Sequence, residues 1–169
     1  RTRCEPVTNC DAFKGENATY LPKTTYADKL SLFSGADQID LYHFGRGHTD
    51  GDTFVVFRAA RTLHAGDMFQ RKGIPFIDVQ NGNGSATEFG ETLKKAVASI
   101  PNIDTVIPGH NPLPVTWSDF VDFSGFYNDV VMKAQQGKAA GRSVDEVVRS
   151  YSVPSQYSDF TAAENSLQS

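Results

Sequence analysis

The stretch that decides the fold is Phe44-Gly45-Arg46-Gly47-His48-Thr49-Asp50-Gly51-Asp52. It separates two short apolar runs with the character of β-strands, Ile39 to Phe44 and Phe54 to Phe57. Its three glycines allow the backbone to turn sharply and to take positive φ angles. We therefore expect His48 to lie at the end of a sheet, where its imidazole is available to a ligand.

Two further polar residues stand in the same kind of glycine-flanked position. Asp67 follows Leu63-His64-Ala65-Gly66, and His110 follows Val106-Ile107-Pro108-Gly109. Each residue comes at the end of a short apolar segment. We expect three strand ends to offer two imidazoles and one carboxylate. This is a ligand set for zinc or a similar divalent metal.

Taken in order, these motifs resemble those of the metallo-β-lactamase superfamily of metal-dependent hydrolases. In that family a Gly-His-Thr loop, a Gly-Asp at a strand end and a Pro-Gly-His supply the later metal ligands. Here Gly47-His48-Thr49, Gly66-Asp67 and Pro108-Gly109-His110 match them. The resemblance spans roughly Lys29 to His110 and implies an α/β fold, or α+β in terms of layers.

The first motif of that family, His-x-His-x-Asp-His, is absent, because the chain holds only four histidines. The sequence therefore resembles the second half of the family's αββα sandwich. We expect one mixed sheet with helices on one face. We also expect the open face to be covered by a missing N-terminal half, a second copy or a swapped segment.

The resemblance also implies roles for the three motif residues. His48 would join a first metal, Asp67 would bridge two metals, and His110 would join the second. The metals are expected to be zinc, with iron or manganese as alternatives. They would activate a hydroxide that attacks an ester, thioester or lactam carbonyl of a small-molecule substrate.

Without the first motif, we expect this truncated half-domain to bind metal weakly and to hydrolyse poorly or not at all on its own. The competing hypothesis is a non-catalytic binding or oligomerisation module that retains the fold. The two differ in whether the missing motif is encoded upstream of Arg1.

Several neighbouring residues are candidates for supporting roles. Arg46 would attract an anionic group of the substrate, unless it is a solvated surface side chain. The long loop of residues 68–86 holds Asp78 and Asn81, which would line a substrate pocket unless the loop is an ordinary surface loop. We expect Thr49 to orient the His48 loop. We expect His64 to lie at the surface or to contact the ligating side chains without binding the metal itself.

The periodicity of apolar residues predicts the secondary structure. His43 shares an alternating face with Ile39 and Leu41, and we expect it to be packed or hydrogen-bonded and not to be a metal ligand. The expected strands are 29–33 and 38–44 as a hairpin, then 53–59, 62–65 and 104–107. The expected helices are 87–99 capped by Thr87, 116–136 and 143–151, with a break at 137–141 and a last helical segment in the tail.

We divide the chain into an entry loop at residues 1–28, holding at most one short strand, a half-domain at 29–136 and a C-terminal helical extension at 137–169. The 16 basic and 20 acidic residues give a net charge of −4, and they form no basic cluster that would recruit nucleic acid or an anionic membrane. No apolar run reaches the roughly 20 residues needed to cross a bilayer.

The N-terminal segment holds the two cysteines, Cys4 and Cys10. They either close a small disulfide or remain free thiols, and the first alternative favours a periplasmic or secreted location. Because the sequence begins at Arg1 and no signal-like segment precedes the fold, we expect the native start to be missing or removed.

Overall fold

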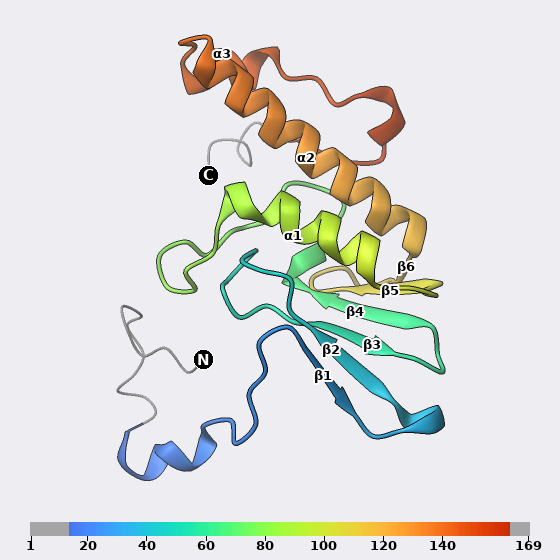
Figure 1. Ribbon diagram of the computed structural model, residues 1–169. Helices are drawn as coiled ribbons and strands as arrows, with labels where there is room; N and C mark the ends of the chain where they lie inside the picture. The colour runs from blue at the N-terminus through green and yellow to red at the C-terminus, as the bar shows by residue number, and fades with distance from the viewer. Residues whose placement is uncertain (1–13, 163–169) are drawn as a thin grey trace.

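The computed structural model describes residues 14–162. Its centre is a six-stranded sheet in the order β1-β2-β3-β4-β5-β6 (Figure 1). The strands are β1 (Lys29–Leu32), β2 (Ile39–Tyr42), β3 (Phe54–Phe57), β4 (Thr62–Gly66), β5 (Thr105–Pro108) and β6 (Val115–Thr116). β4 and β5 pair in parallel and the other neighbours pair antiparallel. The predicted mixed sheet, with its first hairpin, is confirmed.

The helices lie on one face of this sheet (Figure 1). α1 (Ala86–Ser99) connects β4 to β5, and α2 (Trp117–Ala139) packs beside it. α3 (Val144–Ser150) packs against α2. Within residues 14–162, four short 3-10 helices complete the described fold: η2 (Gly15–Tyr20), η3 (Gly35–Asp37), η4 (Asp67–Phe69) and η5 (Ser155–Tyr157). The predicted α/β architecture with helices on one face is therefore confirmed.

An aromatic core joins the helices to the sheet. Buried aromatic side chains come from β2, β3, η4, α1, α2 and the segment after η5; they are Tyr42, Phe54, Phe69, Phe89, Phe120, Phe123, Phe126, Tyr127 and Phe160. Phe69 stacks on Phe123 with ring centroids 4.6 Å apart, and Phe160 stacks on Phe126 at 5.1 Å. This core anchors η4, and η4 begins at Asp67.

The other face of the sheet carries an apolar surface that no described element covers. Alternation turns Asp40 and Tyr42 of β2 toward the helices and Ile39 and Leu41 away from them. Strand register places the outward side chains in two rows, Leu30-Leu41-Val55-His64-Ile107 and Leu32-Ile39-Phe57-Thr62-Thr105. We call these two rows the open face. All of these side chains are partly or fully exposed.

Asp40 is a charged residue buried on the helix-facing side. Its carboxylate accepts hydrogen bonds from Ser31 at 2.6 Å, Gln38 at 3.0 Å and Arg58 at 2.5 Å. Lys29 lies 3.4 Å away. Burial raises the pKa of Asp40, but these hydrogen bonds and the Arg58 charge outweigh burial and hold the pKa well below its usual range.

Local signals predicted most helix ends, with two corrections. Thr116 and Ser143 form the capping boxes of α2 and α3, as their sequences indicate. The cap of α1 is Ser85, whose hydroxyl accepts from the Glu88 amide, and not the predicted Thr87. Gly137 does not break α2, because the helix continues to Ala139.

Two other expectations fall in the terminal segments. In the entry loop the described part forms η2 and holds no strand before β1. At the start of the tail the structure has the short η5, and the part of the tail after residue 162, where the expected helical segment could also lie, is outside the described residues. Cys4 and Cys10, for which a disulfide and free thiols are both open alternatives, lie outside the described residues.

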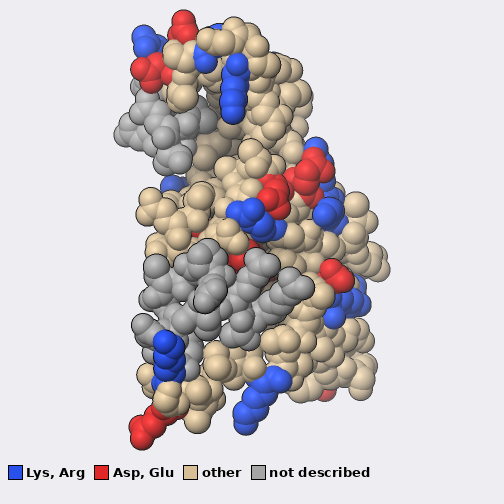
Figure 2. Space-filling view, turned by 60° about the vertical axis from the view of Figure 1, so that its left-hand side comes forward, with Lys and Arg blue, Asp and Glu red and all other residues tan. Residues whose placement is uncertain are grey.

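None of the helices within residues 14–162 combines the length and the apolar character that a bilayer crossing needs. Figure 2 shows basic and acidic side chains interspersed over the face that it presents. The described surface in that view therefore carries mixed charge, as the balanced composition predicts.

Candidate metal centre

His48, Asp67 and His110 lie together at one end of the sheet. His48 Nε2 is 3.3 Å from Asp67 Oδ2, and His110 Nε2 is 3.0 Å from Asp67 Oδ1. The three residues come from the loop after β2, the start of η4 and the loop after β5. The structure therefore brings together the three side chains that the sequence singled out.

The parallel pairing of β4 and β5 places Asp67 beside His110. Parallel neighbours end at the same edge of a sheet, so the residues that follow Gly66 and Pro108 emerge side by side. Two backbone hydrogen bonds then hold the loop after β5 against η4 and the residue after it. Gly109 N–H donates to the Phe69 carbonyl at 3.1 Å, and His110 N–H donates to the Gln70 carbonyl at 3.1 Å.

Gly109 leaves room for the Asp67 carboxylate. A Cβ at position 109 would overlap Asp67 Oδ1 and would lie 2.8 Å from the carbonyl oxygen of Gly66. A side chain larger than hydrogen would therefore push the carboxylate away from His110. The glycine of the Pro-Gly-His motif is required by this close approach and not by an unusual φ angle.

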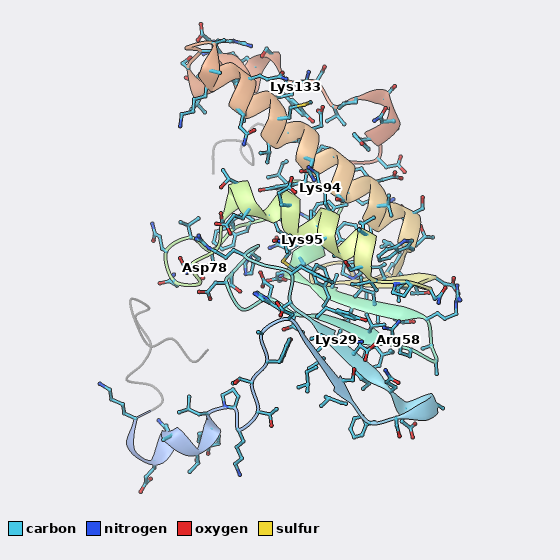
Figure 3. The ribbon with its side chains drawn as sticks, in the orientation of Figure 1. Lys29, Arg58, Asp78, Lys94, Lys95 and Lys133 are labelled. Carbon is cyan, nitrogen blue, oxygen red and sulfur yellow. The ribbon has the colours of Figure 1, made fainter. Side chains whose placement is uncertain are left out.

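The His48 loop is bonded to the long loop that precedes α1. The Asp78 amide donates to the His48 carbonyl at 2.9 Å, and the Ser85 amide donates to the Gly47 carbonyl at 2.9 Å. A Cβ at Gly84 would overlap that His48 carbonyl. Figure 3 shows Asp78 on this loop, at the same end of the sheet as the loop after β2.

The hydrogen bonds of His48 select its tautomer. Its Nδ1 lies 2.9 Å from the carbonyl oxygen of Phe76, which can only accept, so we assign the proton to Nδ1. The side-chain amide of Gln70 lies 3.3 Å from Nδ1 but donates to the Phe76 carbonyl at 3.0 Å. Nε2 then presents a lone pair toward Asp67.

Gln70 holds the Phe76 backbone in place. Its side chain is 5% exposed and also accepts from the Phe76 amide at 3.1 Å, so both polar groups of the amide bind one peptide segment. The same Phe76 carbonyl fixes the His48 ring. We call this arrangement, Gln70 with the Phe76 backbone and His48 Nδ1, the amide clamp.

The donor set fits a divalent metal. With Nδ1 protonated, His48 Nε2 and Asp67 Oδ2 are two hydrogen-bond acceptors facing each other at 3.3 Å, an arrangement that a cation between them would stabilise. Two ligand atoms bound to one zinc in tetrahedral geometry are separated by about 3.4 Å, given bonds of about 2.1 Å. In residues 14–162, however, no group of three or more His, Cys, Asp or Glu side chains has a geometry ready to hold a metal ion.

The fold of the chain is similar to that of several solved structures. No protein-family model and no curated protein matches the chain. Among solved structures, a metallo-β-lactamase from Pontibacter korlensis is 19% identical with a TM-score of 0.52, over 63% of this chain and 49% of that protein. The DIM-1 metallo-β-lactamase is 17% identical with a TM-score of 0.50, over 63% and 48%. The chain has part of the metallo-β-lactamase fold.

A third structure, of the protein TMB-1, is 15% identical with a TM-score of 0.51, over 63% of this chain and 47% of that one. The chain therefore spans about half the length of the solved structures that it matches. At these identities the likeness concerns the metallo-β-lactamase fold alone.

Arg46 is bonded to the long loop and to the first turn of α1. Its guanidinium donates to Asn83 at 2.9 and 3.1 Å, to the Gly84 carbonyl at 3.0 Å and to Glu88 at 3.0 Å. These bonds make Arg46 a brace between the two loops. Its predicted contact with an anionic substrate stays a prediction.

Asp78 and Asn81 lie in one turn of the long loop. The Asp78 carboxylate accepts from the Asn81 amide at 2.9 Å. Hydrogen bonds from the backbone of Asn81 and Gly82 lower the pKa of Asp78. Asn81 is exposed. Their predicted part in a substrate pocket stays a prediction.

The two supporting residues differ in position. Thr49 binds Asp52 through its amide at 2.7 Å and through its hydroxyl at 3.0 Å, which closes the His48 loop. His64 is exposed on the open face and, within the described residues, has no hydrogen bond or ion pair to the three clustered side chains. His43 is hydrogen-bonded through Nδ1 to the Asp52 carbonyl at 2.9 Å, as predicted.

Sequence reasoning missed Gln70 and Asp52. Gln70 is an isolated glutamine in an irregular segment, and Asp52 is one of several acidic residues near a glycine. Only the partners of these side chains show what they do, and the partners of Gln70 lie 6 and 22 residues away.

Proposed function

We propose that His48, Asp67 and His110 are ligands of a metal centre in a metal-dependent hydrolase. The observation that carries the proposal is the convergence of two imidazole Nε2 atoms on the two oxygens of one carboxylate, at 3.3 and 3.0 Å. The part of the metallo-β-lactamase fold in which they occur supports it.

Within this proposal the chain's own residues hold and orient the ligands. The amide clamp keeps the Nε2 lone pair of His48 directed at Asp67, and Gly109 keeps the carboxylate beside His110. A bound divalent metal, zinc in our proposal, would lower the pKa of a water toward about 7 and so supply a nucleophile for an ester, thioester or lactam carbonyl.

We further propose that ligands from outside this chain complete the centre. Three donors leave a metal with open positions, and His110 is 62% exposed in its side chain. The open face supports the same idea, because its apolar rows would be buried by a missing half, a second copy or a swapped segment.

Zinc titration of the chain by isothermal calorimetry tests this function. We expect weak binding that is lost in His48→Ala and retained in His64→Ala, a matched control because His64 lies on the open face. Zinc binding that survives His48→Ala would overturn the assignment. Tight stoichiometric binding by the chain alone, lost in His48→Ala, would instead contradict the need for outside ligands.

The alternative is a non-catalytic binding or oligomerisation module. The open face favours it, because an apolar sheet surface of this kind marks an interaction site. The two functions differ in their response to metal. If the assembled protein associates through the open face but binds no zinc at His48, the module is the correct description.

A further inference from the structure

A groove lies between the C-terminal half of α2 and α3, and it involves none of the residues of the metal centre. Its volume is about 500 Å³. The lining combines apolar and basic side chains and contains no acidic one: Val130, Lys133, Ala134, Lys138, Arg142, Val144, Val147, Val148 and Tyr151. Figure 3 shows Lys133 on α2, in the half of the helix that faces α3.

Helical geometry explains this lining. Val130 and Ala134 are four residues apart, so they lie one above the other on α2, while Lys133 and Lys138 fall on opposite sides of that stripe at about 100° per residue. α3 stays close because Val147 packs on Gly137, where a Cβ would overlap it. Val144, at the start of α3, is 64% exposed at the rim of the groove.

Within the described residues, none of the basic side chains of the groove forms an ion pair with a carboxylate, although the charge of Arg142 adds to the hydrogen bonds that lower the pKa of Glu146. Across residues 14–162, the side chains of Lys133 and Lys138 make no ion pair or hydrogen bond. Arg142 donates to the Glu146 carbonyl and the Ser150 hydroxyl, which are neutral acceptors.

The acidic side chains nearest the groove are bonded to partners other than the two lysines of the groove, and one of these partners, Tyr151, lines the groove. The Glu146 carboxylate caps α3 through Ser143, and Asp129 accepts from the Tyr151 hydroxyl. Asp145 faces Arg149 at 3.7 Å. The groove therefore offers an apolar floor with two lysine side chains that have no partner among the described residues, and with Arg142 held at its rim by neutral acceptors.

We propose that this groove binds a free anionic amphiphile, with an acyl chain on the valine floor and a carboxylate head at the basic rim. The size favours a small molecule over a protein partner. Pockets for small molecules measure about 300–1,000 Å³, whereas a stable protein partner buries about 800 Å² on each side. The groove between α3 and half of α2 has the volume of a small-molecule pocket, but it lacks the area that a stable protein partner would bury.

The probe is dodecanoate, held below the concentration at which it forms micelles, with the 169-residue chain and calorimetry as the assay. We expect saturable binding of one molecule. Replacing both Lys133 and Lys138 by glutamine is expected to weaken it about three- to tenfold, because each partly exposed charge contributes modestly. Lys94→Gln is the matched control, since Lys94 lies on α1 and pairs with Glu91.

A second variant keeps the test independent of folding. Val144→Asp adds a negative charge at the rim, and a carboxylate in the first turn of α3 is favourable to the helix. We expect this variant to retain its circular dichroism spectrum and to bind dodecanoate more weakly.

The proposal is overturned if dodecanol binds as well as dodecanoate, or if Lys94→Gln weakens binding as much as the double variant. Binding to phosphatidylglycerol vesicles without binding of free dodecanoate would also overturn it, as would an acidic amphipathic peptide that occupies the groove while dodecanoate does not.

Discussion

The amide clamp leads to a prediction for Gln70. Gln70→Leu removes the two hydrogen bonds from the side chain to Phe76, at 3.0 and 3.1 Å, and leaves a buried side chain of similar size. Each net hydrogen bond contributes about 0.5–1.5 kcal/mol, so we expect the free energy of unfolding to fall by about 1–3 kcal/mol. Mutation of a residue that orients a metal ligand typically weakens metal affinity 10- to 100-fold, so we also expect weaker zinc binding.

The effect on His48 separates this account from a general loss of stability. In the parent chain we expect the Nδ1–H tautomer, because the Phe76 carbonyl accepts from Nδ1. In Gln70→Leu we expect a mixture of tautomers and about tenfold weaker zinc binding. Gln70→Glu tests the same point, since it keeps the acceptor for the Phe76 amide but places a carboxylate against the Phe76 carbonyl.

Nitrogen chemical shifts of the imidazole ring report the tautomer, and calorimetry reports zinc affinity. Gln135→Leu is the matched control, because Gln135 is an exposed glutamine on α2. The reasoning is refuted if His48 carries its proton on Nε2 in the parent chain. It is also refuted if both Gln70 variants keep the parent tautomer and zinc affinity.

Three further predictions concern close packing, the buried charge and the open face. Gly109→Ala is expected to displace the Asp67 carboxylate, to weaken zinc binding and to lower the free energy of unfolding in urea by about 1–3 kcal/mol. Gly51→Ala is the control, because open space surrounds Gly51, and it is expected to leave both quantities nearly unchanged. Equal effects of the two substitutions would contradict the role of position 109. Arg58→Leu removes the 2.5 Å partner of Asp40 and is expected to cost about 3 kcal/mol at pH 7 in urea unfolding. The folded-state pKa of Asp40 lies below its unfolded value. The stability that ionised Asp40 gives the parent chain is therefore complete above pH of about 4 and is lost as the pH falls through the folded-state pKa. A stability difference between the parent and Arg58→Leu that disappeared only above pH 7 would contradict this sign. Phe57→Asp, in the open face, is expected to weaken association with any covering partner by about 2 kcal/mol in sedimentation, and unchanged association would place the interface elsewhere.

The parts of the site that could be predicted from sequence have local causes. His48, Asp67 and His110 each follow a glycine. Gly66 and Gly109 stand at the ends of β-type runs, and Gly47 lies in the loop that follows one. The parallel pairing of β4 with β5 followed from a helix between two strands, and it brings two of the three residues together. Capping boxes at α2 and α3 were equally local.

Other features depend on contacts between distant residues. The face of β2 that the helices cover could not be chosen from alternation, because Asp40 and Tyr42 look polar and yet lie inside, where Arg58 and Ser31 satisfy the carboxylate. Gly137 looks like a helix breaker but lies within α2, because Val147 of α3 needs the space.

The role of Arg46 shows the same limit. A basic residue two positions before His48 suggested contact with a substrate. Its partners, Asn83 and Gly84, are 37 and 38 residues away and belong to a loop without periodicity. No pattern in the sequence could have paired them.

Anomalous diffraction from crystals soaked in zinc tests the central claim most directly. The account predicts one or two zinc peaks between Asp67 and the two imidazoles. The Nε2 atoms of His48 and His110, and a carboxylate oxygen of Asp67, are each expected at about 2.0–2.2 Å from a zinc ion. A zinc peak at other sites with none beside Asp67, at a concentration that saturates binding, would contradict it.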